Sequence, residues 1–427
     1  MTGINRKYNL EIEVLTPLSI GAGAEKDWVR GIDFVVEGGK LYKLNIKKML
    51  QNGISPEDMS SLFSSKNENG LKAKLAGKLE QVSDTIIPVT VQSDNDVKAF
   101  VKNQLTGKPV LTGSSVKGSL RSVLFQYPGG KTNNGKEVFG SSTEGDEFMR
   151  FIKISDAEFE TTSLVNTKIF NLRKPNNEWL GGWKYDFSTT RKEFSETGFN
   201  TLYECIMPQQ RGIATLMMSA TIYDKFESDK KPHIKSEKKR PILHDDISTL
   251  FGIINSHTKR YLLKEKAFFS KYTADKTEDI INSINSLLDQ IPSDNSFCVL
   301  KMSAGAGFHS ITGDWQFDDY TQAPLDRKRV REGKVNPKSR KIAVWDNYFS
   351  PMGFVKLRNM SDEEIALIEN KRREKIILQQ QEERAKAEEA RKQAKAAEKA
   401  RIEHEKRQEE FNNHIDEPCN PHFPNGK

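Results

Sequence analysis

Hydrophobic and polar residues alternate at the start of the chain in the pattern of a strand that buries one face. Apolar side chains occupy every second position from Leu10 to Val14, with glutamates between them, and the run ends at Thr16-Pro17. Two further strand-like segments, 33–37 and 40–44, flank Gly38-Gly39. Because glycine adopts the positive φ angles of a two-residue turn without strain, these segments predict a β-hairpin.

Apolar positions three and four residues apart predict the main helices. This spacing begins at Ile247 and recurs from Ile280 to Ile291. Shorter helices are expected after Asn45, which can cap a helix, and from Pro56, which suits a first helical turn. Further strands are predicted at 148–157, 201–206, 213–223 and 297–302, and loops at 131–147 and 224–245, whereas residues 174–200 show no clear period. The order of strands and helices indicates an α+β fold built in layers.

The chain changes character at Ser361. From there to residue 415 it contains neither Gly nor Pro, and oppositely charged residues recur four apart, as at Glu382 and Lys386. Such a segment predicts a long charged helix bathed in solvent, followed by a flexible tail at 416–427. The helix could stand alone, or it could pair as a coiled coil through small alanines, which form a weak seam.

Length and composition agree with a chain that is only partly globular. At roughly 100–200 residues per domain, 427 residues predict two or three domains. With glycine counted in place of tyrosine, the apolar share is roughly 41%, below the roughly 45–50% of globular domains. The net charge is +7, and residues 361–427 contribute −2, so the preceding residues carry +9. A positive charge can serve solubility or attract phosphates.

The sequence predicts neither a membrane segment nor a metal site. No stretch approaches the roughly 18 apolar residues of a membrane span, and the N-terminus lacks the apolar region of a signal peptide. The three cysteines, Cys205, Cys298 and Cys419, form no Cys-x-x-Cys pair, and the seven histidines form no zinc-binding pattern. We therefore expect a cytoplasmic, reduced protein without a cofactor.

The most informative segment runs from Lys108 to Phe125. A short extended piece ends at Gly113, a serine can cap the following helix, and Lys117 and Arg121 share one helical face. Free backbone N–H groups at a helix start favour anions, and two cations one turn apart extend that preference along a phosphate chain. Gly118 lies between them and leaves room for another backbone. The same features also fit an ordinary capped helix with solvated cations, and a lysine before rather than after Gly118 excludes a Walker A loop.

Three glycine-marked segments follow one another in the order and spacing of a known family. They are Thr16-Pro17-Leu18-Ser19-Ile20-Gly21-Ala22-Gly23, Gly113-Ser114-Ser115-Val116-Lys117-Gly118-Ser119-Leu120-Arg121, and Phe139-Gly140 followed by Ile154-Ser155-Asp156-Ala157. Together they resemble the RAMP superfamily of CRISPR-associated proteins. The segments Ser339-Arg340-Lys341 and Pro351–Leu357 resemble one branch, the type III-A (Csm) effector subunit that caps the 3′ end of the guide RNA. The resemblance covers about residues 8–357 and leaves out the charged tail.

The resemblance implies both a fold and a ligand. The fold would comprise two ferredoxin-like (RRM-like) RAMP modules with helical insertions, at residues 1–225 and 226–360, followed by the helical extension at 361–415. The ligand would be single-stranded guide RNA (crRNA), whose backbone contacts glycine-rich loops. Carried over to this sequence, the RNA-binding residues would be Gly21, Gly23, Gly113, Ser114, Ser115, Lys117, Gly118, Arg121, Gly305 and Gly307. Gly21 and Gly23, in the loop after the first strand, would contact either the RNA or another subunit. Other RAMP subunits and, indirectly, target RNA would be further partners.

Two of the candidate RNA contacts have equally ordinary explanations. Gly305-Ala306-Gly307 resembles the family's second glycine-rich loop, but Ala306 stands where a bulky aromatic residue is common, so a packing role is an alternative. The basic run that contains Arg327 and Arg329 fits a phosphate contact by its charge, or a solvated loop. We include both segments among the candidates.

Three classes of function follow. The first is a non-catalytic guide-RNA subunit, since a guide varies in sequence and only its phosphates and riboses are constant; an interior backbone subunit of the same complex is the nearest alternative. The second is an endoribonuclease that processes guide RNA, in which His309 would be a general base, or otherwise a structural histidine. The third is a scaffold whose C-terminal helix recruits another protein. We predict the first, without catalytic residues.

Overall fold

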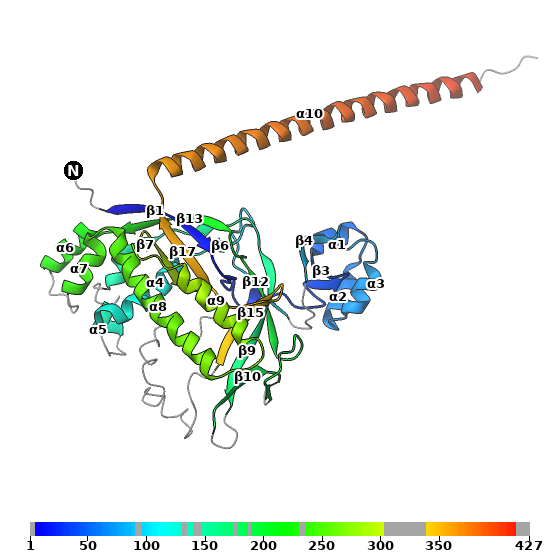
Figure 1. Cartoon of the computed structure of the whole chain (residues 1–427). Coiled ribbons are helices and arrows are strands. Elements are labelled where there is room, and N and C mark those ends of the chain that lie inside the picture. Colours follow the sequence, from blue (N-terminus) through cyan, green and yellow to red (C-terminus); the bar gives the residue numbers. More distant parts are fainter. Residues whose placement is uncertain are drawn as a thin grey trace, which may run out of the picture. The chain divides into compact units, whose positions relative to one another are not determined.

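The computed structural model describes residues 5–89, 96–129, 135–140, 143, 147–173, 178–186, 189–229, 236–302 and 339–415. The chain forms two compact units, Met1–Met360 and Ser361–Lys427. The first combines sheets and helices, and the described part of the second is a long helix (Figure 1). The predicted α+β class and C-terminal helix are thus confirmed, while the ferredoxin-like detail of the modules stays a prediction.

The central sheet of the first unit is built around the strand predicted at the start of the chain. Its antiparallel strands lie in the order β14 (Phe297–Lys301), β17 (Phe354–Asn359), β1 (Arg6–Val14), β13 (Arg211–Met218) and β7 (Ile152–Ile154). As the alternation predicts, Leu10, Ile12 and Val14 are buried. Glu11 and Glu13 face the opposite side, where they pair with cations on β13 and β17. One face of this sheet is therefore core and the other is charged.

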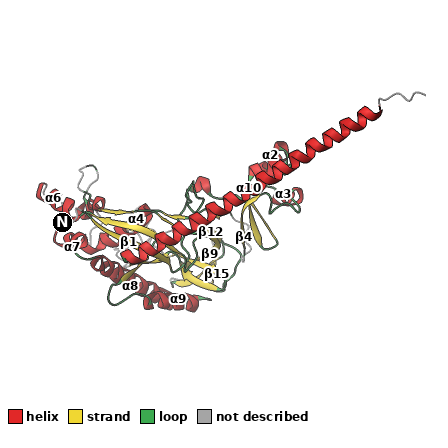
Figure 2. Cartoon of the chain, turned by 90° about the horizontal axis from the view of Figure 1, so that it is seen from above, coloured by secondary structure: helices red, strands yellow, loops and turns green. Residues whose placement is uncertain are grey.

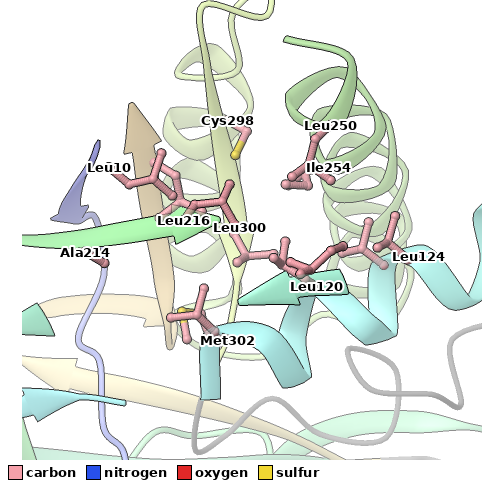
Figure 3. Close-up of a cluster of buried hydrophobic side chains, with 14 of the residues drawn as sticks. Leu10, Leu120, Leu124, Ala214, Leu216, Leu250, Ile254, Cys298, Leu300 and Met302 are labelled. Carbon is pink, nitrogen blue, oxygen red and sulfur yellow. The ribbon is translucent and has the colours of Figure 1, made fainter. Parts of the chain in front are cut away.

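Two helices supply the apolar partners of this sheet. Leu120 and Leu124 of α4 (Gly113–Gly129) meet Leu250 and Ile254 of α8 (Ile247–Lys271) in a buried cluster that also contains Leu300 of β14 (Figure 3). α8 was predicted from the spacing of its apolar residues, and α4 was predicted from the extended piece that ends at Gly113 and the capping residue after it. Burial of that face, rather than helix propensity alone, stabilises helices of this kind.

A second sheet is centred on the long strand β9 (Ser163–Arg173). One edge of β9 pairs with β10 (Leu180–Lys184) and β12 (Asn200–Cys205), beyond which lie β11 (Thr190–Arg191) and β5 (Val97–Lys98). The other edge pairs with β15 (Ser339–Trp345), which continues to β16 (Tyr348–Pro351). The C-terminal half of α8 and the predicted helix α9 (Thr277–Asp289) share an aromatic core with this sheet.

A small layer with its own core carries the predicted hairpin. Strands β2 (Phe34–Glu37), β3 (Lys40–Leu44) and β4 (Ser83–Pro88) pack with helices α1 (Ile46–Gln51), α2 (Pro56–Ser64) and α3 (Glu68–Lys74). Gly38 and Gly39 form the turn, with φ angles of 56° and 73°. Asn45 caps α1 by accepting a hydrogen bond of 3.0 Å from the Lys48 amide. The hairpin and both short helices are therefore confirmed.

Residues 131–158 differ from the sequence prediction. The expected loop contains a short helix, α5 (Gly135–Phe139), and the expected strand is divided into a 3-10 turn, η2 (Phe148–Phe151), β7 and β8 (Ala157–Glu158). β8 pairs with β6 (Val110–Leu111). The strand prediction is confirmed at β7 but wrong for 148–151, because Phe148, Met149 and Phe151 are all buried, which a turn allows and a two-residue period does not.

The prediction of a loop at 224–245 is also wrong for the described residues. Helix α6 (Ala220–Asp229) begins where the strand predicted at 213–223 was expected to continue, and α7 (Ser236–His244) follows. Ile242 and Leu243 of α7 are fully buried in the first core. The basic composition of this region predicted a loop, because the residues that pack against Ile242 and Leu243 lie far away in the chain.

The second unit contains α10 (Asp362–Ile415), a continuous charged helix (Figure 2). Its start is a capping box, because the Ser361 hydroxyl accepts from the Glu364 amide at 3.2 Å and the Glu364 carboxylate accepts from the Ser361 amide at 2.9 Å. Ion pairs four residues apart, such as Glu388 with Lys392 at 2.8 Å, follow along its length. The predicted long helix is confirmed.

The central sheet contains strands from both sides of residue 225, namely β1, β7 and β13 before it and β14 and β17 after it. The division into modules at 1–225 and 226–360 stays a prediction. Within the described ranges, no helix has the length and hydropathy that crossing a bilayer requires.

Candidate nucleic-acid interface

The predicted RNA-binding turn lies where β6 leads into α4. Thr112, rather than a serine, caps the helix, since its side chain accepts from the Ser115 amide at 3.3 Å. The Gly113 amide donates to Asp156 Oδ1 at 2.8 Å. A Cβ atom on Gly113 would overlap the carbonyl oxygen of Ile154. Gly113 is thus a packing glycine, and the anion that its amide was expected to bind is replaced by a carboxylate of the chain itself.

Gly118 occupies a different environment. It is exposed on α4, and outside its own helix no described atom lies within 4 Å of the position that a Cβ would take. The close backbone approach predicted here is therefore not made by the described part of this chain. Ser114 is also exposed, and Ser115 is half-buried with its hydroxyl 2.8 Å from that of Thr112. The surface around Gly118 is open to a ligand.

The two predicted cations of α4 differ in their partners. The Arg121 guanidinium lies 4.4 Å from the ring centroid of Phe139, and its Nε lies 3.9 Å from Glu147 Oε1. Lys117 is half-buried and has no ion-pair partner among the residues that the structure describes. The contact of Arg121 with Phe139 brings together two of the segments that carry the family resemblance. Lys117 is consequently the cation more available to a ligand.

The loop after β1 contains the other two predicted glycines. Gly21 is exposed and forms an isolated bridge with Phe100, while exposed Gly23 has a φ of 111°. Beside this loop lies a cavity whose lining includes Lys26, Lys43 and Lys102. Sequence reasoning missed these lysines because they are scattered along the chain, and no spacing links them.

The remaining candidates lie outside the described residues. They are Gly305, Gly307, His309, Arg327 and Arg329. Their predicted roles stay predictions.

The C-terminal segments of the resemblance have structural contacts. Arg340 forms an ion pair of 2.7 Å with Glu265, and both side chains are buried. The Gly353 amide donates to the Pro17 carbonyl at 2.9 Å, and the Phe354 amide donates to Thr16 Oγ1 at 3.0 Å. These contacts join the last strands of the first unit to the segment after β1.

His257 offers little for general-base chemistry. Burial, helped by the neighbouring charges of Arg260 and Lys264, lowers the pKa of His257 to about 3. A base this weak is poorly matched to neutral pH. His244 Nε2 lies 2.8 Å from Asp224 Oδ1. Among the described residues, no group of three or more His, Cys, Asp or Glu side chains is arranged to hold a metal ion.

The fold belongs to a known class. The family model of the RAMP superfamily matches residues 11–317, and the chain belongs to this superfamily, as the glycine-marked segments predicted. No curated protein matches the chain in sequence.

Solved structures share the fold, and two of them are similar over most of this chain. One is a chain from the cryo-EM structure of a Csm–crRNA–target RNA ternary complex of a type III-A CRISPR-Cas system, with a TM-score of 0.57, 15% identity, and coverage of 83% of this chain and 100% of that chain. The other is the crystal structure of T.onnurineus Csm5, with a TM-score of 0.53, 13% identity, and coverage of 81% and 99%. At these identities the likeness establishes the fold alone.

Proposed function

We propose that this protein is a non-catalytic subunit of a type III-A CRISPR effector complex that binds guide RNA and caps its 3′ end. Membership of the RAMP superfamily supports this role, as do two structural neighbours that are Csm proteins. One neighbour comes from a complex that contains crRNA and target RNA. Guide RNA, other RAMP subunits and, indirectly, target RNA are the proposed partners.

The proposal rests on the exposed surface of α4 at Gly118, where no described atom outside the helix lies close to the glycine. A glycine inside a helix costs about 0.5–1 kcal/mol relative to alanine, and the described fold gives no packing reason for it here. The close approach of a ligand backbone would supply that reason. Lys117 adds a positive charge beside it, and phosphate contacts of this kind do not depend on base sequence.

No catalytic residue is assigned. The lowered pKa of His257 argues against a role as general base at neutral pH. The carboxylates of Asp33 and Asp156 accept from the backbone amides of Val29 and Gly113, which gives both a structural role. The alternative is an endoribonuclease, and the experiments below distinguish it from a non-catalytic subunit.

Substitution of Gly118 tests the RNA interface directly. Gly118→Ala should stabilise the protein by about 0.5–1 kcal/mol, because nothing described obstructs the methyl group. The same variant should bind single-stranded RNA more weakly, as measured by filter binding with the full chain. Ser119→Ala, one position along the helix, is the matched control. If Gly118→Ala gains stability but binds RNA with unchanged affinity, Gly118 is not part of the RNA interface.

Substitution of Lys117 tests the electrostatic part. Each neutralised phosphate of a single strand contributes about 0.7 to the slope of log affinity against log salt. Lys117→Gln should therefore flatten that slope by about 0.7, whereas Lys47→Gln, at an exposed lysine of α1, should not. Equal effects of both variants would indicate only general charge attraction.

The capping role needs the complex itself. Tagged protein purified from its native cells should carry other RAMP subunits and guides with a defined 3′ end, with one copy of this chain per complex by native mass spectrometry. Several copies along each guide would identify an interior backbone subunit instead. A lone protein that cleaves repeat RNA would identify an endoribonuclease.

A further inference from the structure

A cavity of about 450 Å³ opens beside the Gly21–Gly23 loop. Its lining brings together residues from the loop, from β3 and from the segment after β5. Three of them are lysines, Lys26, Lys43 and Lys102, and one carboxylate, that of Glu204, lies among them. The cavity therefore carries an excess of positive charge.

Lys43 lacks the partner that a half-buried cation normally has. Its Nζ lies 4.5 Å from the ring centroid of Trp28, and no ion pair to it occurs within the part of the chain that the structure describes. Lys102 Nζ lies 5.5 Å from the same ring. The pKa of Lys43 is lowered by burial and then by the charge of Lys102, which outweigh the opposing effects of Glu204, Asp84 and Asp33. Two like charges thus lie close to one aromatic ring.

Glu204 does not neutralise this surplus. Its side chain is fully buried and accepts from Lys102 Nζ at 2.6 Å, from the Phe100 amide at 2.9 Å and from the Thr162 hydroxyl at 2.6 Å. These donors hold the carboxylate in place and orient the Lys102 ammonium. Among the described residues that line the cavity, one negative charge then faces three positive ones, and the lining keeps a surplus of positive charge at Lys26 and Lys43.

The missing partner has the chemistry of a phosphate. Ammonium groups are compact donors that bind phosphate oxygens as point charges, and several of them can share one phosphate group. A nucleobase fits less well, because Trp28 is only 4% exposed and lies beneath the lysines, so its ring cannot stack on a base. The cavity is suited to an anion and not to an aromatic ligand.

We propose that Lys26, Lys43 and Lys102 form a phosphate-binding pocket. On the proposed function, on which this assignment of the source rests, the phosphate belongs to the guide RNA. Lys102 is bridged to Pro109, four residues before Gly113, so the backbone of Lys102 lies at most about 20 Å from the start of α4. A single RNA strand can therefore contact both the pocket and the Gly118 surface.

Chemical modification measures how strongly a bound ligand protects each lysine of the pocket. The full chain is treated briefly with acetic anhydride at pH 8, alone, with inorganic phosphate, or with a single-stranded RNA oligonucleotide, and mass spectrometry quantifies each acetylated lysine. With RNA at about ten times its Kd, acetylation of Lys43 should slow about tenfold. Lys40 is the internal control, because it lies on the other face of β3 and pairs with Glu80.

A substitution gives the matching affinity measurement. Lys43→Gln removes one of two repelling charges, so the fold should not suffer, which a thermal unfolding measurement checks. RNA affinity should fall about tenfold or more, as expected for one lost charge-assisted contact. Lys40→Gln is the matched control and should bind RNA as the wild type does.

The outcomes separate this pocket from the proposed function. Protection of Lys43 by RNA together with weakened binding by Lys43→Gln supports the pocket on the guide-RNA path. RNA binding that is weakened by Gly118→Ala, with Lys43 neither protected nor needed, overturns the pocket and leaves the proposed function standing. Protection by inorganic phosphate without RNA binding supports a site for free phosphate and contradicts the proposed function. Protection by neither probe overturns the pocket.

Discussion

Lys301 gives the first unit a stability that should depend on pH. It ends β14 in a buried position, where its Nζ donates to the Met352 carbonyl at 2.5 Å and lies 4.9 Å from the ring centroid of Phe354. Burial lowers its pKa from 10.5 to about 7, although the charge of Glu265 opposes the shift. The fold therefore contains a lysine that releases its proton near neutrality.

The size and sign of the effect follow from linkage. A displacement of the pKa from 10.5 to about 7 corresponds to about 5 kcal/mol of differential interaction. Because the folded-state pKa lies below the unfolded one, the unfolded chain holds more protons between about pH 7 and 10.5. The free energy of unfolding should therefore rise with pH across this window, by about 2 kcal/mol between pH 7 and pH 9.

Substitution of Lys301 isolates this contribution. Lys301→Met keeps a long flexible side chain and removes the titrating group, so its stability advantage over the wild type at pH 7 should shrink by about 2 kcal/mol at pH 9. Urea denaturation followed by tryptophan fluorescence reports the first unit alone, since all five tryptophans precede Ser361. Lys40→Met, at an exposed lysine, should show no such trend. A stability difference that stays constant or widens with pH would refute the reasoning.

Three further predictions concern the architecture. Glu265→Ala should destabilise the first unit by about 3–5 kcal/mol in urea denaturation, because it leaves the Arg340 charge buried without its partner, and a smaller loss would show that water reaches the guanidinium. Gly113→Ala should lower the melting temperature despite the helix preference of alanine, since the methyl group meets the Ile154 carbonyl; an unchanged melting temperature would contradict this packing role. Deletion of residues 361–427 should leave the urea midpoint of the first unit unchanged, and a shift would reveal stabilising contacts between the units.

Local pattern alone determined much of the secondary structure. The alternation in β1, the Gly38-Gly39 turn and the apolar spacing in α8 and α9 each lie within a few consecutive residues, where backbone sterics and the burial of one face decide the conformation. The charged helix α10 followed from composition in the same way. Residues 224–245 could not be predicted, because the burial of Ile242 and Leu243 depends on partners far along the chain.

The candidate interface shows the same division. The sequence by itself located the start of α4, its two cations and Gly118, because they lie within one short segment. Only the tertiary structure showed that the Gly113 amide donates a hydrogen bond to Asp156 and that Arg121 lies against Phe139. It alone brought the scattered lysines of the phosphate pocket together around one buried ring. Contacts between distant residues are determined by how sheets and helices pack. The spacing of residues along the sequence does not predict that packing.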